Sequence, residues 1–376
     1  MTPRTLPGPR RLDRSQPTSA ATGYSLARPF LELLPPERAH ALALLALRVA
    51  GGIGRIQPIN AKSQALDSCG LGFPNRVGLA AGLDKNAIAV AGLARLGFGF
   101  IEVGTVTPRP QPGQPPPRLF RLRHSAALVN RMGFPNDGAD VIAGRLAKAR
   151  RRGVSLPIGV NIGKNATTPL ERAVDDYLAG LRALHRVADY IAVNVSSPNT
   201  TGLRDLQESQ RLEPILTALL EERRRLTALG GRENARPVPL LVKLSPDLSD
   251  EAFEEAGLLV RRLGIDGVIA TNSTLQRDGL ALDPRDGARS AEAGGLSGAP
   301  LRDRALHAVR RLRAALGPKP LLIGVGGIQS PADARAMRAA GADLVQLYTG
   351  LIVRGPALVR ECIDALDGSD DSGVRS

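Results

Sequence analysis

Two lysines stand where they could take part in chemistry. Lys85 and Lys243, two of the six lysines in the chain, each fall at the end of a short apolar run that predicts a β-strand. A lysine in such a position can form a Schiff base, neutralise an anionic ligand or stabilise a reduced flavin. A structural ion pair is the alternative for either lysine taken alone.

Uncharged amides form a second group near the predicted strand ends. They supply hydrogen-bond donors and acceptors without charge, which suits a planar, amide-rich ring that bears a carboxylate. A lone asparagine at a strand end is usually a turn former, but all eight predicted strand ends carry amides, hydroxyls, lysines or glycines. No strand end carries paired carboxylates or a histidine–carboxylate cluster, which disfavours glycoside hydrolysis and a catalytic metal. The asparagines are Asn130, Asn161, Asn194, Asn199 and Asn272.

Glycine clusters predict where a phosphate would bind. Gly324–Gly327 and Tyr348-Thr349-Gly350 follow the last two predicted strands, and Gly294–Gly298 precedes a predicted helix. Small residues leave backbone N–H groups exposed, and barrel enzymes often bind phosphate in the loops after strands seven and eight. Each cluster alone could be an ordinary turn at the start of a helix. Together they favour a phosphorylated cofactor or substrate.

The elements that position these residues alternate between strand and helix. Helical patterns at 171–186, 251–263, 301–316 and 332–340 separate the strands, and the long gap from 106 to 156 holds a predicted β-hairpin (119–122 and 127–129). Eight such units in one chain predict an α/β fold, a closed (β/α)8 TIM barrel, whose chemistry lies at the C-terminal ends of the strands. The predicted strands are 77–81, 100–104, 158–161, 191–195, 240–244, 268–271, 321–325 and 344–347.

Composition excludes several classes of protein. The 376 residues are 43% hydrophobic and 23% charged, a globular balance. Two cysteines cannot form a disulfide framework. The net charge of +14 comes from arginine, but aromatic residues are only 3% and tryptophan is absent, so bases would find few side chains on which to stack. The arginines cluster late in predicted helices, where they complement the helix dipole. An anionic membrane surface or an acidic substrate is the alternative for this charge.

The ends of the chain differ from its centre. Residues 1–23 are rich in Pro, Arg, Ser and Thr without periodicity and predict a disordered leader, with a transit peptide as the alternative. Residues 24–60 predict a small N-terminal helical extension: Pro35-Pro36 opens a helix that Gly51-Gly52 closes. Its apolar face could pack on a core, lie on a bilayer or frame an apolar tunnel. Residues 61–366 form the predicted barrel, and 367–376 a disordered tail.

Long ordered motifs resemble one family. Gly78-Leu79-Ala80-Ala81-Gly82-Leu83-Asp84-Lys85, Asn130-Arg131-Met132-Gly133-Phe134 and Asn194-Val195-Ser196-Ser197-Pro198-Asn199-Thr200 are similar to class 2, quinone-dependent, dihydroorotate dehydrogenases. The match extends over about residues 24–365 and includes Gly104–Pro108, Gln111–Gly113, Gly294–Gly298, Gly324–Ile328 and Tyr348–Gly350. Class 1 enzymes carry cysteine where Ser197 stands. Many relatives carry serine where Thr349 stands, and a backbone N–H contact would survive that change.

The resemblance implies roles for individual residues. Ser197 would be the catalytic base, assisted by Thr200 and Phe134. One FMN per chain would be bound by Ala81, Gly82, Leu83, Asp84, Lys85, Thr105, Asn161, Asn194, Lys243, Thr271, Gly298, Gly327, Tyr348 and Thr349. Dihydroorotate would be held by Lys85, Asn130, Arg131, Met132, Gly133, Phe134, Asn194, Asn199, Asn272 and Ser273.

The implied function is an enzyme activity at a membrane. A flavoprotein of this family would oxidise (S)-dihydroorotate to orotate in de novo pyrimidine (UMP) biosynthesis and pass the electrons to a membrane quinone. The resemblance makes the N-terminal helices a lipid-facing cap over a quinone tunnel. We therefore expect a monomeric peripheral protein on the cytoplasmic face of a bacterial inner membrane, with no nucleic-acid partner.

Two other functions are compatible with parts of the pattern. A flavin-free (β/α)8 lyase or isomerase could use Lys243 as a Schiff-base amine and the glycine loops for a sugar phosphate. A non-catalytic basic barrel could bind nucleic acid or a membrane with steep salt dependence. The colour of the purified protein separates the first alternative from a flavoenzyme.

Overall fold

Eight parallel strands form the closed barrel that the sequence predicts. The computed structural model describes residues 19–53, 66–230, 236–278, 280 and 286–367. All eight predicted strands are present, because their apolar runs are buried both inside the barrel and beneath the helices. In barrel order they are β3 (Val77–Leu79), β4 (Phe100–Val106), β7 (Ile158–Ile162), β8 (Tyr190–Asn194), β9 (Leu240–Leu244), β10 (Gly267–Ala270), β12 (Leu321–Val325) and β13 (Leu344–Leu347).

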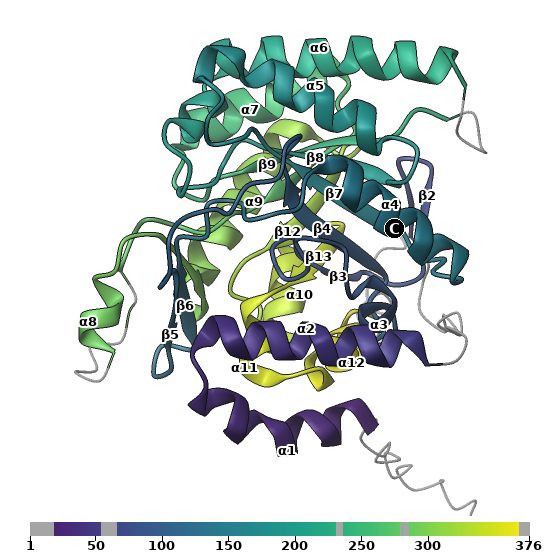
Figure 1. Cartoon of the computed structure of the whole chain (residues 1–376). Helices are drawn as coiled ribbons and strands as arrows, with labels where there is room; N and C mark the ends of the chain where they lie inside the picture. Colours follow the sequence, from purple (N-terminus) through teal and green to yellow (C-terminus); the bar gives the residue numbers. More distant parts are fainter. Residues whose placement is uncertain (1–18, 54–65, 231–235, 279, 281–285, 368–376) are drawn as a thin grey trace, which may run out of the picture.

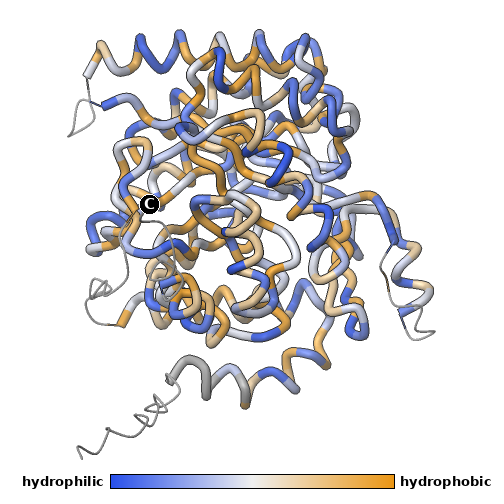
Figure 2. Tube along the Cα trace, turned by 180° about the vertical axis from the view of Figure 1, so that it is seen from behind, coloured by the Kyte–Doolittle hydropathy of each residue, from blue (hydrophilic) through white to orange (hydrophobic). Residues whose placement is uncertain are grey.

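Helices cover the outside of the barrel (Figure 1). Figure 2 shows hydrophobic residues along the central strands and hydrophilic residues on the outer turns of the helices. The arginine clusters do fall late in helices, as at Arg150 and Arg151. The helices are α3 (Val90–Ala94), α4 (Ala139–Arg151), α5 (Ala173–Leu184), α6 (Ser209–Ala228), α7 (Asp250–Leu263), α9 (Arg302–Leu316), α10 (Pro331–Ala339), α11 (Thr349–Arg354) and α12 (Ala357–Asp367), with short turns η1 (Leu170–Arg172), η2 (Leu203–Gln207), η3 (Ala299–Leu301) and α8 (Gly287–Ser290).

A short antiparallel hairpin that the sequence did not predict precedes the barrel. Strands β1 (Leu66–Ser68) and β2 (Leu71–Phe73) pair with each other. Phe73 is fully buried, and its ring meets that of Phe100 edge to face at 5.4 Å between centroids. The hairpin thereby buries an aromatic pair where Phe73 meets Phe100, the first residue of strand β4.

A three-stranded sheet stands beside the mouth of the barrel. The predicted hairpin is present as β5 (Leu119–Leu122) and β6 (Ala127–Asn130). The glycine-rich segment around 294–298, which the sequence predicts as a loop, instead adds β11 (Gly295–Gly298) antiparallel to β6. Leu296 drives this pairing, because it is fully buried against the apolar face of the hairpin.

Two helices precede the barrel. Helix α2 (Pro36–Gly52) has the predicted limits, and α1 (Ser19–Leu33) begins five residues before the predicted start of the helical extension. Alanines at 20 and 21 favour the helix there. Residues 1–18, 54–60 and 368–376, which carry parts of the terminal predictions, lie outside the described residues. Among the helices that the structure describes, none is long and apolar enough to cross a membrane.

Different contacts hold the two N-terminal helices. Helix α2 crosses α3 with backbones touching, since a Cβ on Gly92 would lie 1.9 Å from the carbonyl oxygen of Leu47. Helix α1 is outermost at this end of the molecule (Figure 1). The Tyr24 hydroxyl donates to the carbonyl of Ile352 at 2.5 Å, and Arg121 donates to the carbonyls of Leu31, Glu32 and Leu34 at its C-terminal end. Polar contacts at its two ends thus attach α1.

Candidate active site

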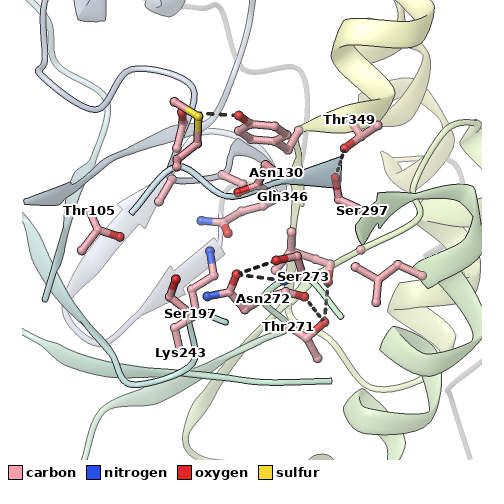
Figure 3. A pocket seen from close by; sticks show the side chains of 18 of the residues that line it. Thr105, Asn130, Ser197, Lys243, Thr271, Asn272, Ser273, Ser297, Gln346 and Thr349 are labelled. Carbon is pink, nitrogen blue, oxygen red and sulfur yellow. Dashed lines mark hydrogen bonds between the residues drawn. The ribbon is translucent and has the colours of Figure 1, made fainter. Parts of the chain in front are cut away.

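One open cavity collects most of the predicted site residues at the C-terminal ends of the barrel strands. Convergent polar side chains in one cavity are typical of a ligand site. The close-up in Figure 3 shows side chains that converge from different strands, among them Thr105, Ser197, Lys243 and Asn272. The predicted residues that line it are Ala81, Gly82, Lys85, Thr105, Asn130, Met132, Gly133, Phe134, Asn194, Ser197, Asn199, Lys243, Thr271, Asn272, Ser273, Gly298, Gly327, Tyr348 and Thr349.

Five predicted residues do not line this cavity. The buried carboxylate of Asp84 accepts hydrogen bonds from the backbone N–H groups of Ile88 and Ala89, while Leu83 packs into the hydrophobic core. The run from Ala81 to Lys85 is a series of turns after β3, in which successive side chains point in different directions, so it cannot place every side chain in the cavity. A ligand contact by Leu83 or Asp84 would have to come from the main chain.

The other three lie around the cavity. Asn161 is fully buried beneath it and accepts a hydrogen bond from Thr105 Oγ1 at 2.6 Å, so it supports a lining residue. Arg131 turns away to pair with Glu292 at 2.6 Å and lies over the Phe120 ring. Thr200 is partly buried on the loop beyond Ser197, where its carbonyl accepts from the N–H of Leu203.

A network of amides fixes the centre of the cavity wall. Asn194 donates from Nδ2 to Thr105 Oγ1 at 2.9 Å, and its Oδ1 accepts from Asn272 Nδ2 at 3.3 Å. Asn272 also donates to Ser196 Oγ at 3.0 Å, and Asn199 donates to Asn130 Oδ1 at 3.1 Å. The strand-end amides therefore orient one another before any ligand binds, which is the preorganisation that catalytic sites need.

Ser197 occupies the loop after β8. Its side chain is 5% exposed, and its Oγ accepts one hydrogen bond from the Asn199 backbone N–H at 3.3 Å. Phe134, in the opposite loop, adopts a left-handed φ of 55°, and Asn136 and Gln111 both donate to its carbonyl. A hydroxyl in this setting can accept a proton from a ligand in the cavity while the phenyl ring excludes water.

Lys243 is buried, Lys85 is partly buried, and the two lysines are chemically distinct. Burial, with Arg118 nearby, lowers the pKa of Lys85 to about 8, and its Nζ donates to the carbonyl of Gly82 at 2.6 Å. Burial also lowers the pKa of Lys243, against which Glu102 acts to raise it. A buried cation facing a cavity attracts negative charge strongly, because few other dipoles screen it.

Sequence reasoning missed two buried polar residues below Lys243. Glu102 is fully buried inside the barrel and accepts from Asn161 Nδ2, the Tyr190 hydroxyl and Gln346 Nε2 at 2.9, 3.0 and 2.8 Å. Gln346 lines the cavity, and its buried Oε1 has no hydrogen-bond partner among the described residues. Both residues interrupt apolar runs. A charged or amide side chain inside a strand predicted to be buried is the signal by which the sequence could have identified them.

The opposite end of the cavity is built from glycine backbone. Gly327 has a φ of 73°, and a Cβ there would lie 2.4 Å from the Cα of Arg302. Gly298 has a φ of 103°, and a Cβ there would lie 2.4 Å from the carbonyl oxygen of Ala126. Thr349 begins α11 and donates to Ser297 Oγ at 2.9 Å. Exposed N–H groups and a helix start in one place suit a phosphate.

Comparison with known proteins settles the family. The dihydroorotate dehydrogenase family profile matches residues 64–369. A protein from Stenotrophomonas maltophilia K279a, described as dihydroorotate dehydrogenase (quinone), is 52% identical over 346 residues, which cover 91% of this chain and 95% of the relative. The chain belongs to the quinone-dependent dihydroorotate dehydrogenase family. A Pseudomonas fluorescens Pf-5 protein of the same description is 49% identical over 347 residues, covering 91% of this chain and 98% of the relative.

Solved structures agree with this membership. The crystal structure of dihydroorotate dehydrogenase from Eimeria tenella in complex with ferulenol superposes with a TM-score of 0.80 at 37% identity, covering 88% of this chain and 90% of that one. The ligand-free form gives 0.79 at 38% identity, with 88% and 94% covered. As a member of this family, whose enzymes depend on a flavin, the chain is an oxidoreductase that oxidises dihydroorotate, and the predicted family and fold are confirmed.

Proposed function

We propose that this chain oxidises (S)-dihydroorotate to orotate with one bound FMN as hydride acceptor and a membrane quinone as final electron acceptor. The observation that carries the proposal is that Ser197, both lysines, the amide network and the glycine-built end face one cavity. The experiment is to release the cofactor from the purified protein by denaturation and identify it by mass. A colourless protein, or a flavin other than FMN, would contradict the proposal.

The residues present fit FMN. The glycine-built end would hold the phosphate through Gly298, Gly327 and the start of α11 at Thr349, where any side chain at the glycines would collide with backbone. At the other end, Lys243 offers a donor, and Gln346 Oε1, which no described residue contacts by a hydrogen bond, offers an acceptor to a ring with carbonyl and imide groups. When bound, FMN supplies the acceptor for the hydride of the substrate.

Ser197 is the residue that accepts the proton lost by the substrate. Dihydroorotate must lose a proton from the carbon next to a ring carbonyl and a hydride from the neighbouring carbon that bears the carboxylate. Ser197 Oγ takes the proton from this carbon while its own hydroxyl proton passes on toward solvent, and the Asn199 N–H orients this oxygen. Asn194, Asn272 and Lys85 hold the ring amides and the carboxylate of the substrate. Thr200, on the loop beyond Ser197, lies where the proton leaves toward solvent.

Lys243 should determine how firmly FMN is held. We expect Lys243→Met to lower the flavin content of the purified protein and the affinity for added FMN by about 10-fold or more, because a buried charge-assisted contact is lost. Fluorescence titration of apoprotein with FMN measures this. Lys164→Met is the matched control, since Lys164 is also buried but donates to the carbonyls of Asn165 and Thr168 outside the cavity. Equal affinities in both variants would contradict the assignment.

Lys85 should give orotate binding a pH dependence. Because its pKa is lowered to about 8, its ammonium loses its proton as the pH rises through that value. We expect the affinity for orotate, an anion, to be full below about pH 7 and to fall above about pH 8, since the neutral amine attracts a carboxylate weakly. Flavin difference absorbance measures binding. Lys85→Met should remove this dependence, and a flat profile in the unaltered protein would show that Lys85 does not hold the carboxylate.

The N-terminal helices supply the proposed route for quinone and the contact with lipid. Leu26, Phe30 and Leu33 on α1 are 72%, 72% and 82% exposed, and Leu42, Leu45 and Val49 on α2 and Ile53 just after it are also exposed. These side chains would enter the headgroup region of a bilayer. Helix α2 also reaches the cavity side, because His40 lies close enough to Lys85 for the ammonium to help burial lower the histidine pKa to about 4.

These features define the proposed setting. The chain would act as a monomer on the cytoplasmic face of a bacterial inner membrane and supply orotate for de novo UMP synthesis, without a nucleic-acid partner. The test is sedimentation with vesicles of Escherichia coli polar lipid, in which Leu26→Ser/Phe30→Ser/Leu33→Ser should stay in the supernatant. Equal sedimentation of this variant and the unaltered protein would contradict the lipid contact.

A further inference from the structure

Three loops at the mouth of the barrel meet at one arginine outside the cavity. Arg204 lies on η2, just after the loop that carries Ser197, and its side chain is 20% exposed. Its Nε donates to the carbonyl of Ser196 at 3.3 Å and its second terminal nitrogen to the carbonyl of Ser273 at 2.9 Å. Its first terminal nitrogen pairs with Asp247 Oδ2 at 2.8 Å. One guanidinium therefore contacts the loops after β8, β9 and β10.

The carboxylate partner is itself fixed. Asp247 is 11% exposed, and its own N–H donates to Ser245 Oγ at 3.1 Å. It accepts from the backbone N–H of Leu275 at 2.8 Å and from the Thr274 hydroxyl. Asp247 thus orients the guanidinium from one side and holds the segment that follows Ser273 from the other. An arginine fork suits this task, because its planar donors fix several acceptors in one geometry.

Of the two residues whose carbonyls Arg204 contacts, one lines the cavity and the other is next in sequence to a residue that lines it. Ser196 immediately precedes Ser197, and Ser273 lines the cavity next to Asn272. We propose that Arg204, held by Asp247, is a positioning residue that joins the Ser197 loop to the loop of Asn272 and Ser273. This arrangement, the Arg204 clamp, keeps the proton acceptor at a fixed place relative to the amides that hold the substrate. The proposal rests on the proposed role of Ser197 as base.

The clamp acts on proton transfer rather than on cofactor binding. Ser197 Oγ has one backbone hydrogen bond of its own, so its position depends on how the loop backbone is held. A displacement of about 1 Å at a reacting atom can cost about 100-fold in rate. Among the described residues, neither Lys243 nor the glycine-built end forms a hydrogen bond or ion pair with Arg204 or Asp247, so FMN should remain bound when the clamp is broken.

The test is anaerobic flavin reduction by dihydroorotate in the full-length, FMN-loaded protein. Arg204→Gln should reduce the flavin about 10- to 100-fold more slowly at saturating substrate, with FMN content unchanged. The deuterium isotope effect for substrate labelled at the carbon that loses the proton should rise, because proton transfer becomes slower. Arg204→Lys keeps the charge without the fork and should be intermediate. Arg262→Gln, which removes an exposed bidentate pair with Glu213, is the control and should match the unaltered protein.

A second variant protects the test against misfolding. Arg204→Gln leaves the Asp247 carboxylate without its cation, which can itself destabilise the loops. Arg204→Gln/Asp247→Asn removes that charge and should show the same slow reduction and raised isotope effect. Reduction within about twofold of the unaltered protein, in a double variant with full FMN and an unchanged melting temperature, would overturn the clamp. If dihydroorotate fails to reduce the unaltered protein, the proposed function fails first and the clamp with it.

Discussion

Replacement of Ser197 by alanine should leave a yellow protein whose flavin is reduced by dihydroorotate about 100- to 10,000-fold more slowly, the range that a general base contributes. Ser197 lines the cavity, is 5% exposed and has one hydrogen bond to its oxygen, from the Asn199 N–H. The methyl group of alanine fills almost the same space, so binding of FMN and orotate should persist. Stopped-flow absorbance of the anaerobic half-reaction measures the rate, and orotate titration measures the retained site.

A matched serine tests whether the effect is specific. Ser125 is also buried, and its Oγ has no hydrogen-bond partner among the described residues. In Ser125→Ala, dihydroorotate should therefore reduce the flavin as fast as in the unaltered protein. A near-normal rate in Ser197→Ala would remove Ser197 from the role of base. A slow rate together with lost flavin would instead indicate a damaged site, which is why flavin content is measured on the same samples.

Removal of residues 1–34, which takes away α1 but leaves α2, should separate the two half-reactions. Reduction of the flavin by dihydroorotate should stay within about twofold, because the residues that line the cavity, in the part of the chain that the structure describes, begin at Ala80. Turnover with a long-chain quinone in vesicles should fall by about 100-fold, since the exposed apolar side chains of Leu26, Phe30 and Leu33 are lost. Steady-state turnover with quinone and with a water-soluble dye measures the difference.

The attachment of α1 explains why this truncation should be tolerated. Helix α1 is attached by Tyr24 at one end and by Arg121 at the other, whereas Leu44 of α2 packs into the barrel core. Turnover with the dye should therefore be preserved and serves as the internal control. Full quinone turnover in the truncated protein would show that quinone does not approach between α1 and the barrel.

The barrel could be predicted because its strands are simple to recognise. A run such as Leu321–Val325 is apolar at every position, since both of its faces are buried, and such runs recur with helices between them. Helix α2 was equally clear, because Pro36 and Gly52 mark its ends. Strand β11 was not, since three of its four residues, Gly295, Ser297 and Gly298, have low β-propensity and the strand depends on β6 as its neighbour.

The sequence predicted which residues belong to the site, but not which way their side chains point. Motif residues share one loop of turns, yet their side chains point in different directions, so Lys85 faces the cavity while Asp84 accepts from the N–H groups of Ile88 and Ala89, just before α3. Arg131 turned away because Glu292 and the ring of Phe120 offered it a partner and a surface. Contacts between distant loops, such as those of Arg204, leave no local pattern in the sequence and required the structure.

The central claim is that the strand-end cavity holds FMN beside dihydroorotate, with Ser197 as proton acceptor. The most direct test is to mix the purified protein with dihydroorotate under anaerobic conditions and follow the visible absorbance of the oxidised flavin. The account predicts rapid, complete bleaching with one orotate formed per flavin, and bleaching slowed by orders of magnitude in Ser197→Ala. A flavin that stays oxidised in the unaltered protein would contradict it.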